Sequence, residues 1–413
     1  MRASTYITYA IFKKKMARLI DAGGIMKRFV VAELVFVLIF LFVQNTFGLP
    51  RFAVRSGAKC QSCHVNPTGG GMRNFYGSTT YGRETLPIKS WQEEFALDDF
   101  STQLSDFFSY GIDFRFLYFY QKQGTTLASR SSFFPMQADV YTNLKLSKKI
   151  SIYANPAFGT TIERYEIFGI ANVLPLSGYV KLGRMTPSYG LRLDDHTTYV
   201  REATPFRNNL GQDAGIEIGL APGPITLMGA VLNGSGGDRA SDKPRAILSR
   251  VSAQFAAGPV NILLGGSTYN NVSNIDDRIN MLGGFAVLSL DGNLTLIADV
   301  ERIKGNSRTM KVNSQRTTGS GSFKIFNDGK DLEQLATYVE ANYVLVQGVD
   351  FKAAYDFFDP DTKLTTGAVT RYTFGFEFFP MSGVEVRPLY RYTKDTVLGL
   401  TANEMHVMFH FYL

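Results

Sequence analysis

The chain has 413 residues, which is enough for one large domain or two ordinary ones. Its mean hydropathy of −0.04 is that of neither a helical membrane protein nor a disordered chain. The net charge of +7 does not indicate a nucleic-acid partner. Residues 1–48 hold seven Lys or Arg against two acidic residues, which leaves only about +2 for all the rest. We therefore expect no nucleic acid among its partners.

Residues 1–48 read as a leader with a signal peptide that begins most naturally at Met26. Two basic residues follow this methionine, then an apolar run over 29–43 and a small-residue cleavage site over 46–48. The run is interrupted by Glu33 and is shorter than the about 20 residues that a membrane-spanning helix needs. A cleaved signal is favoured, with a retained anchor as the alternative. Either way, the chain matures outside the cytoplasm.

The stretch AKCQSCHVNPTGGGMRNFYG, residues 58–77, holds both cysteines of the chain and one of its four histidines. Cys60 and Cys63 are three residues apart, and His64 follows at once. A disulfide would close a very small loop, a thioredoxin-type pair would need a βαβ setting, and a zinc site would need further ligands. Covalent haem attachment needs two thiols at this spacing and an adjacent imidazole. The spacing thus predicts one haem c on Cys60 and Cys63, with His64 as axial ligand of its iron.

Residues 66–71 follow the histidine with a turn signal and three glycines. Asn66-Pro67 predicts a turn. Gly69 to Gly71 either let the backbone pass close to a flat, bulky group or form a flexible linker. The cytochrome segment, 49–100, is too short to enclose haem by itself, so it is expected to pack inside or against a larger body.

From about Ser101 to the last residue, apolar and polar residues alternate in short segments separated by Gly, Asn, Asp and Ser. In RYTFGFEFF, Tyr372 and Phe374 fall on one face of a strand, and Arg371 and Glu377 fall on the other. ADVYTNLKL and LTLIADVE divide in the same way. Before Ser101, residues 78–99 look irregular, with WQEEFALDD as the single hint of a helix.

A secreted β-sandwich and a membrane barrel both produce this alternation. The membrane barrel is favoured because the pattern continues over 101–413, which gives about 16 strands within a range of 14 to 18. Aromatic residues recur near strand ends, as in FRFLYFY and RPLYRY. The last segment, EMHVMFHFYL, has a wholly apolar outward set from Met405 to Leu413, as a closing strand requires. We predict an all-β, transmembrane antiparallel barrel over 101–413, preceded by the short haem-binding plug segment at 49–100.

Together, RFAVRSGAKCQSCH, the glycine-containing continuation and the barrel pattern resemble the fused monohaem cytochrome-porins of bacterial outer membranes, a group that includes iron(II) oxidases. VNPTGGGMRNFYG departs from the iron-oxidase pattern, so the substrate is less defined than the architecture. Separately, KLGRMTPSYGLRLDDHTTYVRE, residues 181–202, resembles a strand and inward-folded loop of anion-selective and related porins. It predicts a constriction inside the pore.

The second axial ligand is left open by the sequence. Each of the five candidates also has an ordinary reading, as a solvated wall histidine or a packing methionine. The candidates are His196 on the inward loop, Met72, Met185, and the lumen-facing His406 and His410.

The resemblance implies an electron-transfer protein, with iron(II) oxidation as one enzymatic form of that activity. It would sit in outer-membrane lipid, with its haem segment on the periplasmic side or within the lumen, and pass electrons between a periplasmic c-type cytochrome and extracellular iron or a multihaem cytochrome. Two alternatives stand beside it: a diffusion porin with a structural or gating haem plug, and a haem-bearing subunit of a multihaem conduit. A set of lumen acids either tunes this site, attracts a metal cation or simply lines the pore: Asp299, Glu301, Glu340, Glu377 and Glu385.

Overall fold

The structure is a computed structural model, and the chain divides into the units Met1–Asn45 and Thr46–Leu413. It describes part of the second unit, namely residues 50–92, 101–124, 129–156, 165–206, 211–234, 246–274, 277–306, 331–364, 367–396 and 399–413. The predicted leader and signal peptide at 1–48 lie outside the described residues. In the described ranges, no helix is long and apolar enough to cross a bilayer.

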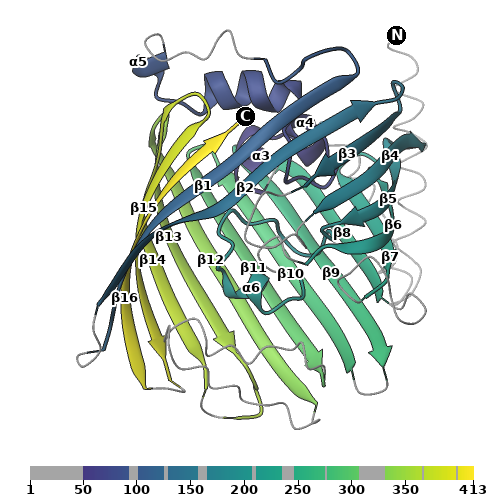
Figure 1. Cartoon of the computed structure of the whole chain (residues 1–413). Coiled ribbons are helices and arrows are strands. Elements are labelled where there is room, and N and C mark those ends of the chain that lie inside the picture. Colours follow the sequence, from purple (N-terminus) through teal and green to yellow (C-terminus); the bar gives the residue numbers. More distant parts are fainter. Residues whose placement is uncertain are drawn as a thin grey trace, which may run out of the picture. The chain divides into compact units, whose positions relative to one another are not determined.

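Sixteen strands form a closed antiparallel barrel in which each strand pairs with its neighbours in the sequence (Figure 1). The strands are β1 (Phe108–Gln123), β2 (Arg130–Lys145), β3 (Ile150–Asn155), β4 (Glu166–Leu174), β5 (Gly178–Met185), β6 (Asp213–Leu220), β7 (Ile225–Leu232), β8 (Ala246–Ala257), β9 (Val260–Asn274), β10 (Asp277–Leu290), β11 (Leu294–Gly305), β12 (Leu332–Val346), β13 (Val349–Asp359), β14 (Val369–Met381), β15 (Val384–Asp395) and β16 (Leu400–Tyr412). β16 closes the barrel against β1, with Phe114 opposite Phe411. The predicted barrel, its strand number and the closing role of the last strand are confirmed.

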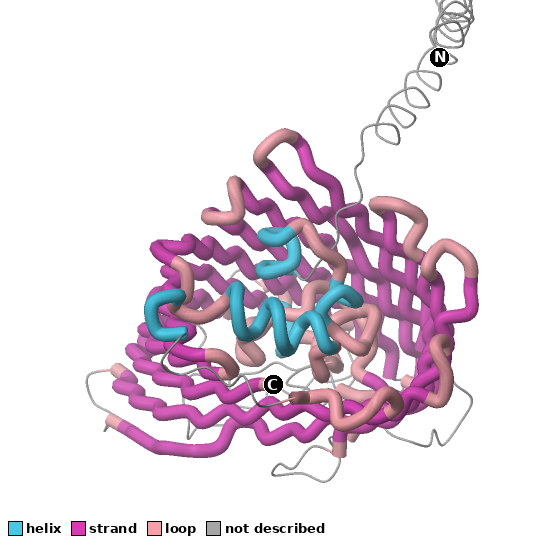
Figure 2. The backbone as a smooth tube through the Cα atoms, turned by 90° about the horizontal axis from the view of Figure 1, so that it is seen from above, coloured by secondary structure: helices cyan, strands magenta, loops and turns pink. Residues whose placement is uncertain are grey.

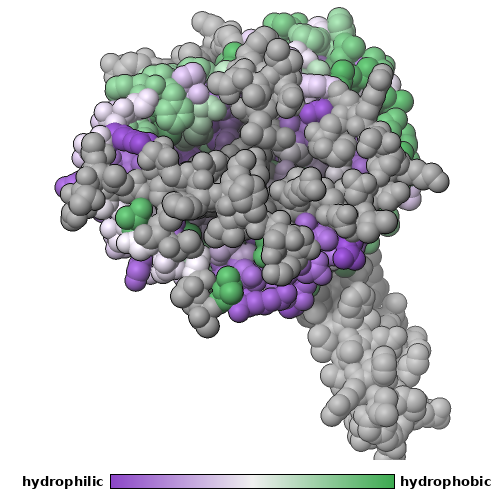
Figure 3. Space-filling view, turned by 60° about the horizontal axis from the view of Figure 1, so that its bottom comes forward, coloured by the Kyte–Doolittle hydropathy of each residue, from purple (hydrophilic) through white to green (hydrophobic). Residues whose placement is uncertain are grey.

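The barrel wall has one apolar and one polar face, as the alternation predicts. On β14, Tyr372 and Phe374 are exposed on the outside, whereas Arg371 and Glu377 are buried on the inside. Figure 3, which brings the long-loop end of the barrel forward, shows hydrophobic residues on the outer wall and hydrophilic residues toward that end. Closure of the sheet leaves no unpaired strand edge, and the apolar outer face suits contact with lipid.

The two ends of the barrel differ in the length of their connections. Short turns such as 347–348 and 382–383 lie at one end, and the C-terminus lies there too, because Tyr412 N donates to Gly383 O at 2.8 Å. Most connections at the opposite end are longer, such as 306–331, although 275–276 is as short.

The N-terminal segment lies within the ring of strands at the short-turn end (Figure 2). Its helices are α3 (Pro50–Ser56), α4 (Cys60–Cys63), η1 (Gly77–Thr85) and α5 (Lys89–Gln92). Lys59 Nζ donates to Gly223 O in a short turn at 2.8 Å, and Ile88 N donates to Phe379 O on β14 at 2.9 Å. The barrel wall therefore covers a segment that has little core of its own.

The expectation of an irregular segment over 78–99 is wrong for its first part. Gly77–Thr85 forms η1, a π-type helix in which Leu86 N donates to Tyr81 O at 3.1 Å. The Tyr81 ring packs edge-on against Phe52 of α3, with the ring centroids 5.9 Å apart. This helix depends on a contact with α3 that local sequence does not reveal. Of WQEEFALDD, only the first two residues are described, at the end of α5.

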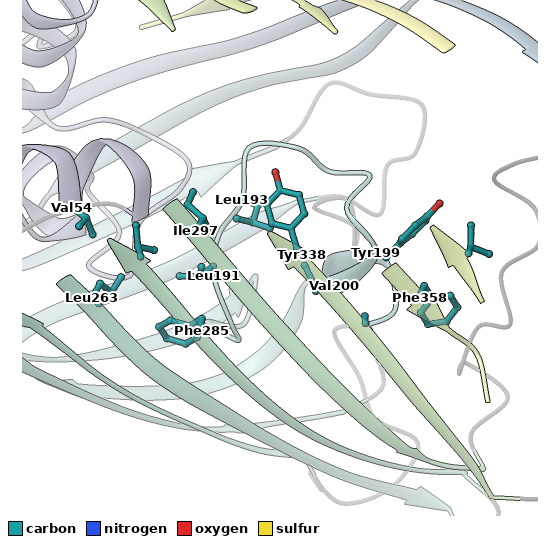
Figure 4. Packing of buried hydrophobic residues seen from close by; sticks show 13 residues of the cluster. Val54, Leu191, Leu193, Tyr199, Val200, Leu263, Phe285, Ile297, Tyr338 and Phe358 are labelled. Atoms are coloured by element: carbon teal, nitrogen blue, oxygen red, sulfur yellow. The ribbon is translucent and has the colours of Figure 1, made fainter. Parts of the chain in front are cut away.

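The connection between β5 and β6 folds into the lumen, as its resemblance to porin loops predicts. This inward loop, residues 186–206, contains the short helix α6 (Tyr199–Glu202). Its apolar residues share a buried cluster with Val54 of α3 and with wall residues (Figure 4). Leu191 N donates to Asp299 Oδ2 at 3.2 Å, and Tyr199 N donates to Asp356 Oδ1 at 3.0 Å. The loop is thus fixed to separate strands inside the lumen.

Substitution of Val300 by Arg tests the outward face. Val300 lies near the middle of β11 and is 43% exposed on the outer wall. If this face contacts lipid, a buried guanidinium there should lower the free energy of unfolding by about 2–4 kcal/mol. Urea unfolding of protein reconstituted in lipid vesicles, followed by circular dichroism, measures the change. Val300→Leu is the control, and equal stability of the two variants would contradict the lipid-facing assignment.

Candidate functional site

The cysteine-histidine motif lies at the short-turn end, where α4 borders two cavities. Cys60 and Cys63 lie on one helical turn without a disulfide between them, and His64 follows directly. Cys63 and His64 line a cavity with about 1230 Å³ of empty space, which includes some open solvent. Cys60 lines a second cavity of about 680 Å³. We refer to the first as the main cavity. The volume that compares with other protein cavities is about 160 Å³, so a bulky cofactor would also occupy the part that is open to solvent.

Asn74 and Gly77 fix the end of α4. The Asn74 side chain donates to Ser62 O at 2.9 Å and to Gln61 O at 3.1 Å, and its backbone N donates to Cys63 O at 2.8 Å. Gly77 N in turn donates to Asn74 Oδ1 at 3.0 Å. A Cβ on Gly77 would overlap the carbonyl group of Cys63, so only glycine allows η1 to approach α4 this closely.

The residues after His64 form a defined turn. Gly69 N donates to Asn66 O at 2.9 Å, which confirms the predicted Asn66-Pro67 turn. Gly69, Gly70 and Gly71 have φ values of 83°, 74° and 64°, a left-handed run that favours glycine at each position. The turn is tied to the barrel interior because Ser188 Oγ donates to Thr68 Oγ1 at 2.7 Å. Gly70 and Gly71 line the main cavity.

His64 is held in its neutral form. It is only 8% exposed, and its Nδ1 is buried without a hydrogen-bond partner. Burial, with a smaller contribution from Arg73, lowers the pKa of His64 to about 4. A neutral imidazole is the form that binds a metal ion.

The main cavity is lined by charges of both signs. Four arginines and four carboxylates line it: Arg73, Arg115, Arg192 and Arg201, and Asp113, Asp139, Glu166 and Asp194. Arg73 lies over the Tyr412 ring, 4.2 Å from the ring centroid, and Arg192 Nη2 donates to Thr186 O at 3.0 Å. Burial, followed by repulsion from Arg192 and Arg115, lowers the pKa of Arg201 to about 10.

These residues fit covalently attached haem. Two thiols without a disulfide lie on one turn, and a neutral imidazole follows the second thiol. A cavity with a glycine-lined wall adjoins Cys63 and His64, whereas Cys60 lines the second cavity. Arg73 and Arg192 lie near His64 and could interact electrostatically with the two carboxylates of a haem.

The candidates for the second iron ligand fall in different surroundings. His196 lines the main cavity, together with His64. Met72 and Met185 are 1% and 0% exposed and belong to an aromatic cluster with Tyr141, Tyr153 and Phe168.

The two histidines of β16 face the lumen as predicted. Carboxylates lie against both ring nitrogens of His410, with Nδ1 2.8 Å from Glu385 Oε2 and Nε2 3.1 Å from Asp113 Oδ1. His406 Nε2 lies 3.2 Å from Glu404 Oε2.

The predicted lumen acids are all buried and mostly connect parts of the structure. Glu377 pairs with Arg51 of α3, and Glu340 lies 2.7 Å from Lys352 Nζ. Tyr189 of the inward loop donates to Glu301. These contacts favour the reading of a structural polar lining.

Several residues that shape the site were not identified from the sequence. Arg51 and Arg55 lie one helical turn apart on α3 and pair with lumen carboxylates. The two arginines are four residues apart and shortly precede the cysteine-histidine motif, and this spacing was the available signal. The contributions of Asn74 and Arg192 had no such signal, because their partners are distant in the sequence or are backbone atoms.

The sequence matches no family model and no curated protein. Solved outer-membrane proteins match its fold. OmpT of Vibrio cholerae shares 10% identity at a TM-score of 0.51, covering 76% of this chain and all of OmpT. The channel DcaP of Acinetobacter baumannii shares 13% at 0.52, covering 74% and 97%. The anion-selective porin from Comamonas acidovorans shares 13% at 0.51, covering 74% and 99%.

At these identities the similarity establishes the fold alone. The chain has the 16-stranded barrel fold of outer-membrane porins. The resemblance of the barrel to anion-selective porins is therefore confirmed as a likeness of fold. Its resemblance to cytochrome-porins stays a prediction.

Substitution of Gly77 by Ala should loosen the motif from η1, because the new methyl group must displace the backbone at Cys63. Such overpacking costs about 1–3 kcal/mol. Limited proteolysis of the purified protein should then cleave the segment 50–92 faster, while the barrel keeps its folded mobility in electrophoresis. Gly284→Ala on β10 is the matched control, since nothing lies within 4 Å of its added Cβ. Equal cleavage rates would contradict the close packing at Gly77.

Proposed function

We propose that this chain is an outer-membrane monohaem c-type cytochrome fused to a porin-like barrel. It transfers electrons across the membrane between a periplasmic c-type cytochrome and an extracellular partner, either iron or a multihaem cytochrome. One observation carries the proposal: α4 places Cys63 and His64 at the main cavity inside a closed barrel, one helical turn from Cys60.

The chain's own residues have separate tasks in this function. Cys60 and Cys63 would hold the haem through two thioether bonds, and His64 would bind its iron through the neutral imidazole. Attachment to both thiols requires Cys60 to face the main cavity in the haem-bearing protein. Asn74 and Gly77 hold the end of α4 in place. The bound haem supplies one-electron redox chemistry, which no side chain of the cavity provides.

The ends of the barrel support an orientation for this activity. Outer-membrane barrels have short periplasmic turns and longer extracellular loops. By that rule, α4 and the main cavity lie toward the periplasm, because Lys59 contacts Gly223 in a short turn. A periplasmic cytochrome could then exchange electrons at this end, and the inward loop extends from the cavity into the lumen.

The contacts of α3 favour a fixed plug rather than an open diffusion pore. Arg51 pairs with Glu377 and lies 3.1 Å from Asp194 of the inward loop, and Arg55 Nη1 lies 2.9 Å from Asp350 Oδ2. Breaking a buried ion pair by removing one partner costs about 3–5 kcal/mol. Spontaneous release of α3 is therefore costly. The fused segment is also compatible with the third function, in which the barrel is a haem-bearing subunit of a multihaem conduit.

Spectroscopy of the purified protein tests the cofactor. The wild type should stain for covalent haem after denaturing electrophoresis and give a c-type spectrum with one reversible redox transition. Cys60→Ala combined with Cys63→Ala should abolish covalent attachment, and His64→Ala should perturb the spectrum of whatever haem remains. His406→Ala is the control and should leave the spectrum unchanged. A wild-type protein without covalent haem would refute the proposal.

Conductance tests the plug against the diffusion-porin alternative. Replacing both Arg51 and Arg55 by Ala removes the ion pairs of α3 with the wall and the inward loop, so conductance in planar lipid bilayers should rise several-fold above that of the wild type. The control is the double variant Arg302→Ala and Lys304→Ala, which removes two exposed positive charges that pair with Glu333. High conductance in the wild type, insensitive to haem oxidation, would favour the diffusion porin.

A further inference from the structure

We infer that His196 of the inward loop is the second axial ligand of the haem iron. This inference rests on the proposed function. It means that the iron site is completed by two parts of the chain that are far apart in sequence, the plug segment and the inward loop.

The cavity lining supports this choice. Among the described residues that line the main cavity, His64 and His196 are the two imidazoles, and the lining contains no methionine. Imidazole and thioether are the usual partners of a proximal histidine in cytochromes of this kind. His196 is thus the lining residue, apart from His64, with a suitable neutral nitrogen donor.

The other candidates have fixed contacts of their own. Binding of His410 to iron would require its ring to give up a buried carboxylate, since Glu385 and Asp113 lie at its two nitrogens. Met72 and Met185 would have to leave an aromatic cluster in which they are almost completely buried. His406 lies outside the lining of the main cavity.

The backbone around His196 is held on both sides. Arg115 Nη1 donates to Asp194 O at 3.2 Å, two residues before the histidine. After it, Thr197 O accepts from Arg371 Nη2 at 2.8 Å, and Thr197 Oγ1 accepts from Arg391 Nη1 at 2.9 Å. Such outer contacts orient a ligand and reduce the entropy lost on metal binding.

The ring nitrogen that would bind iron can be named. Arg115 Nη1 lies 3.2 Å from His196 Nε2, and because a guanidinium only donates, Nε2 is the acceptor and carries the lone pair. When Nε2 binds iron, Arg115 keeps two other acceptors, Asp113 Oδ1 at 3.1 Å from its Nε and the carbonyl of Asp194. Arg115 would therefore lose one hydrogen bond and keep the two others.

Spin state tests the inference on the full-length, haem-bearing protein. The wild type should show six-coordinate, low-spin ferric haem in its absorption and electron paramagnetic resonance spectra. His196→Ala should become high-spin and bind carbon monoxide rapidly when reduced, and added imidazole should restore the low-spin spectrum. His406→Ala is the matched control, because it removes another lumen imidazole and should stay low-spin.

A second variant covers the case in which His196→Ala does not assemble. His196→Met keeps a ligand at the same position, so it should stay low-spin and shift the midpoint potential to more positive values, because thioether ligation raises the potential relative to imidazole. A low-spin His196→Ala protein, or an unchanged potential in His196→Met, would overturn the inference while leaving the proposed function intact. Absence of covalent haem from the wild type would overturn both.

Discussion

Arg51 joins the three parts of this structure. It lies on α3, pairs with Glu377 of β14, and lies 3.1 Å from Asp194 of the inward loop. Arg51 is 6% exposed and Glu377 is fully buried, so each charge depends on the other for compensation. Burial opposes ionisation of Asp194, but Arg51 and Arg387 together lower its pKa to about 2. The carboxylate therefore stays charged over the physiological range, and plug, wall and loop remain connected.

The strand pattern of the barrel could be predicted because each position depends on local alternation alone. Phe374 outside and Glu377 inside follow from period-two patterning, and the apolar set of β16 follows in the same way. The helix η1 could not be predicted, since its Tyr81 packs on Phe52, which lies in another helix. Tertiary contacts of this kind override local propensity.

The same division applies to the candidate site. The spacing of Cys60, Cys63 and His64 is local, and it identified the motif without any fold. For the second ligand, strand facing placed His406 and His410 in the lumen correctly but could not show their partners. Asp113, which lies at His410 Nε2, belongs to the first strand, β1, whereas His410 belongs to the last strand, β16. Only closure of the barrel brings the two residues together. His196 was predicted to lie in the lumen because residues 181–202 resemble a strand and inward-folded loop of porins.

In the proposed haem protein, the contact between plug and loop would also set the reduction potential. Arg73 and Arg192 both act on the pKa of His64, so two fixed positive charges lie near the iron ligand. Positive charge favours the reduced iron and raises the potential, whereas a second imidazole in place of a thioether lowers it. Arg73 belongs to the plug segment, and both Arg192 and His196 belong to the inward loop. In that protein, Arg73 of the plug segment and Arg192 of the inward loop would raise the potential and His196 of the same loop would lower it. A displacement of the loop would therefore change two opposing contributions together.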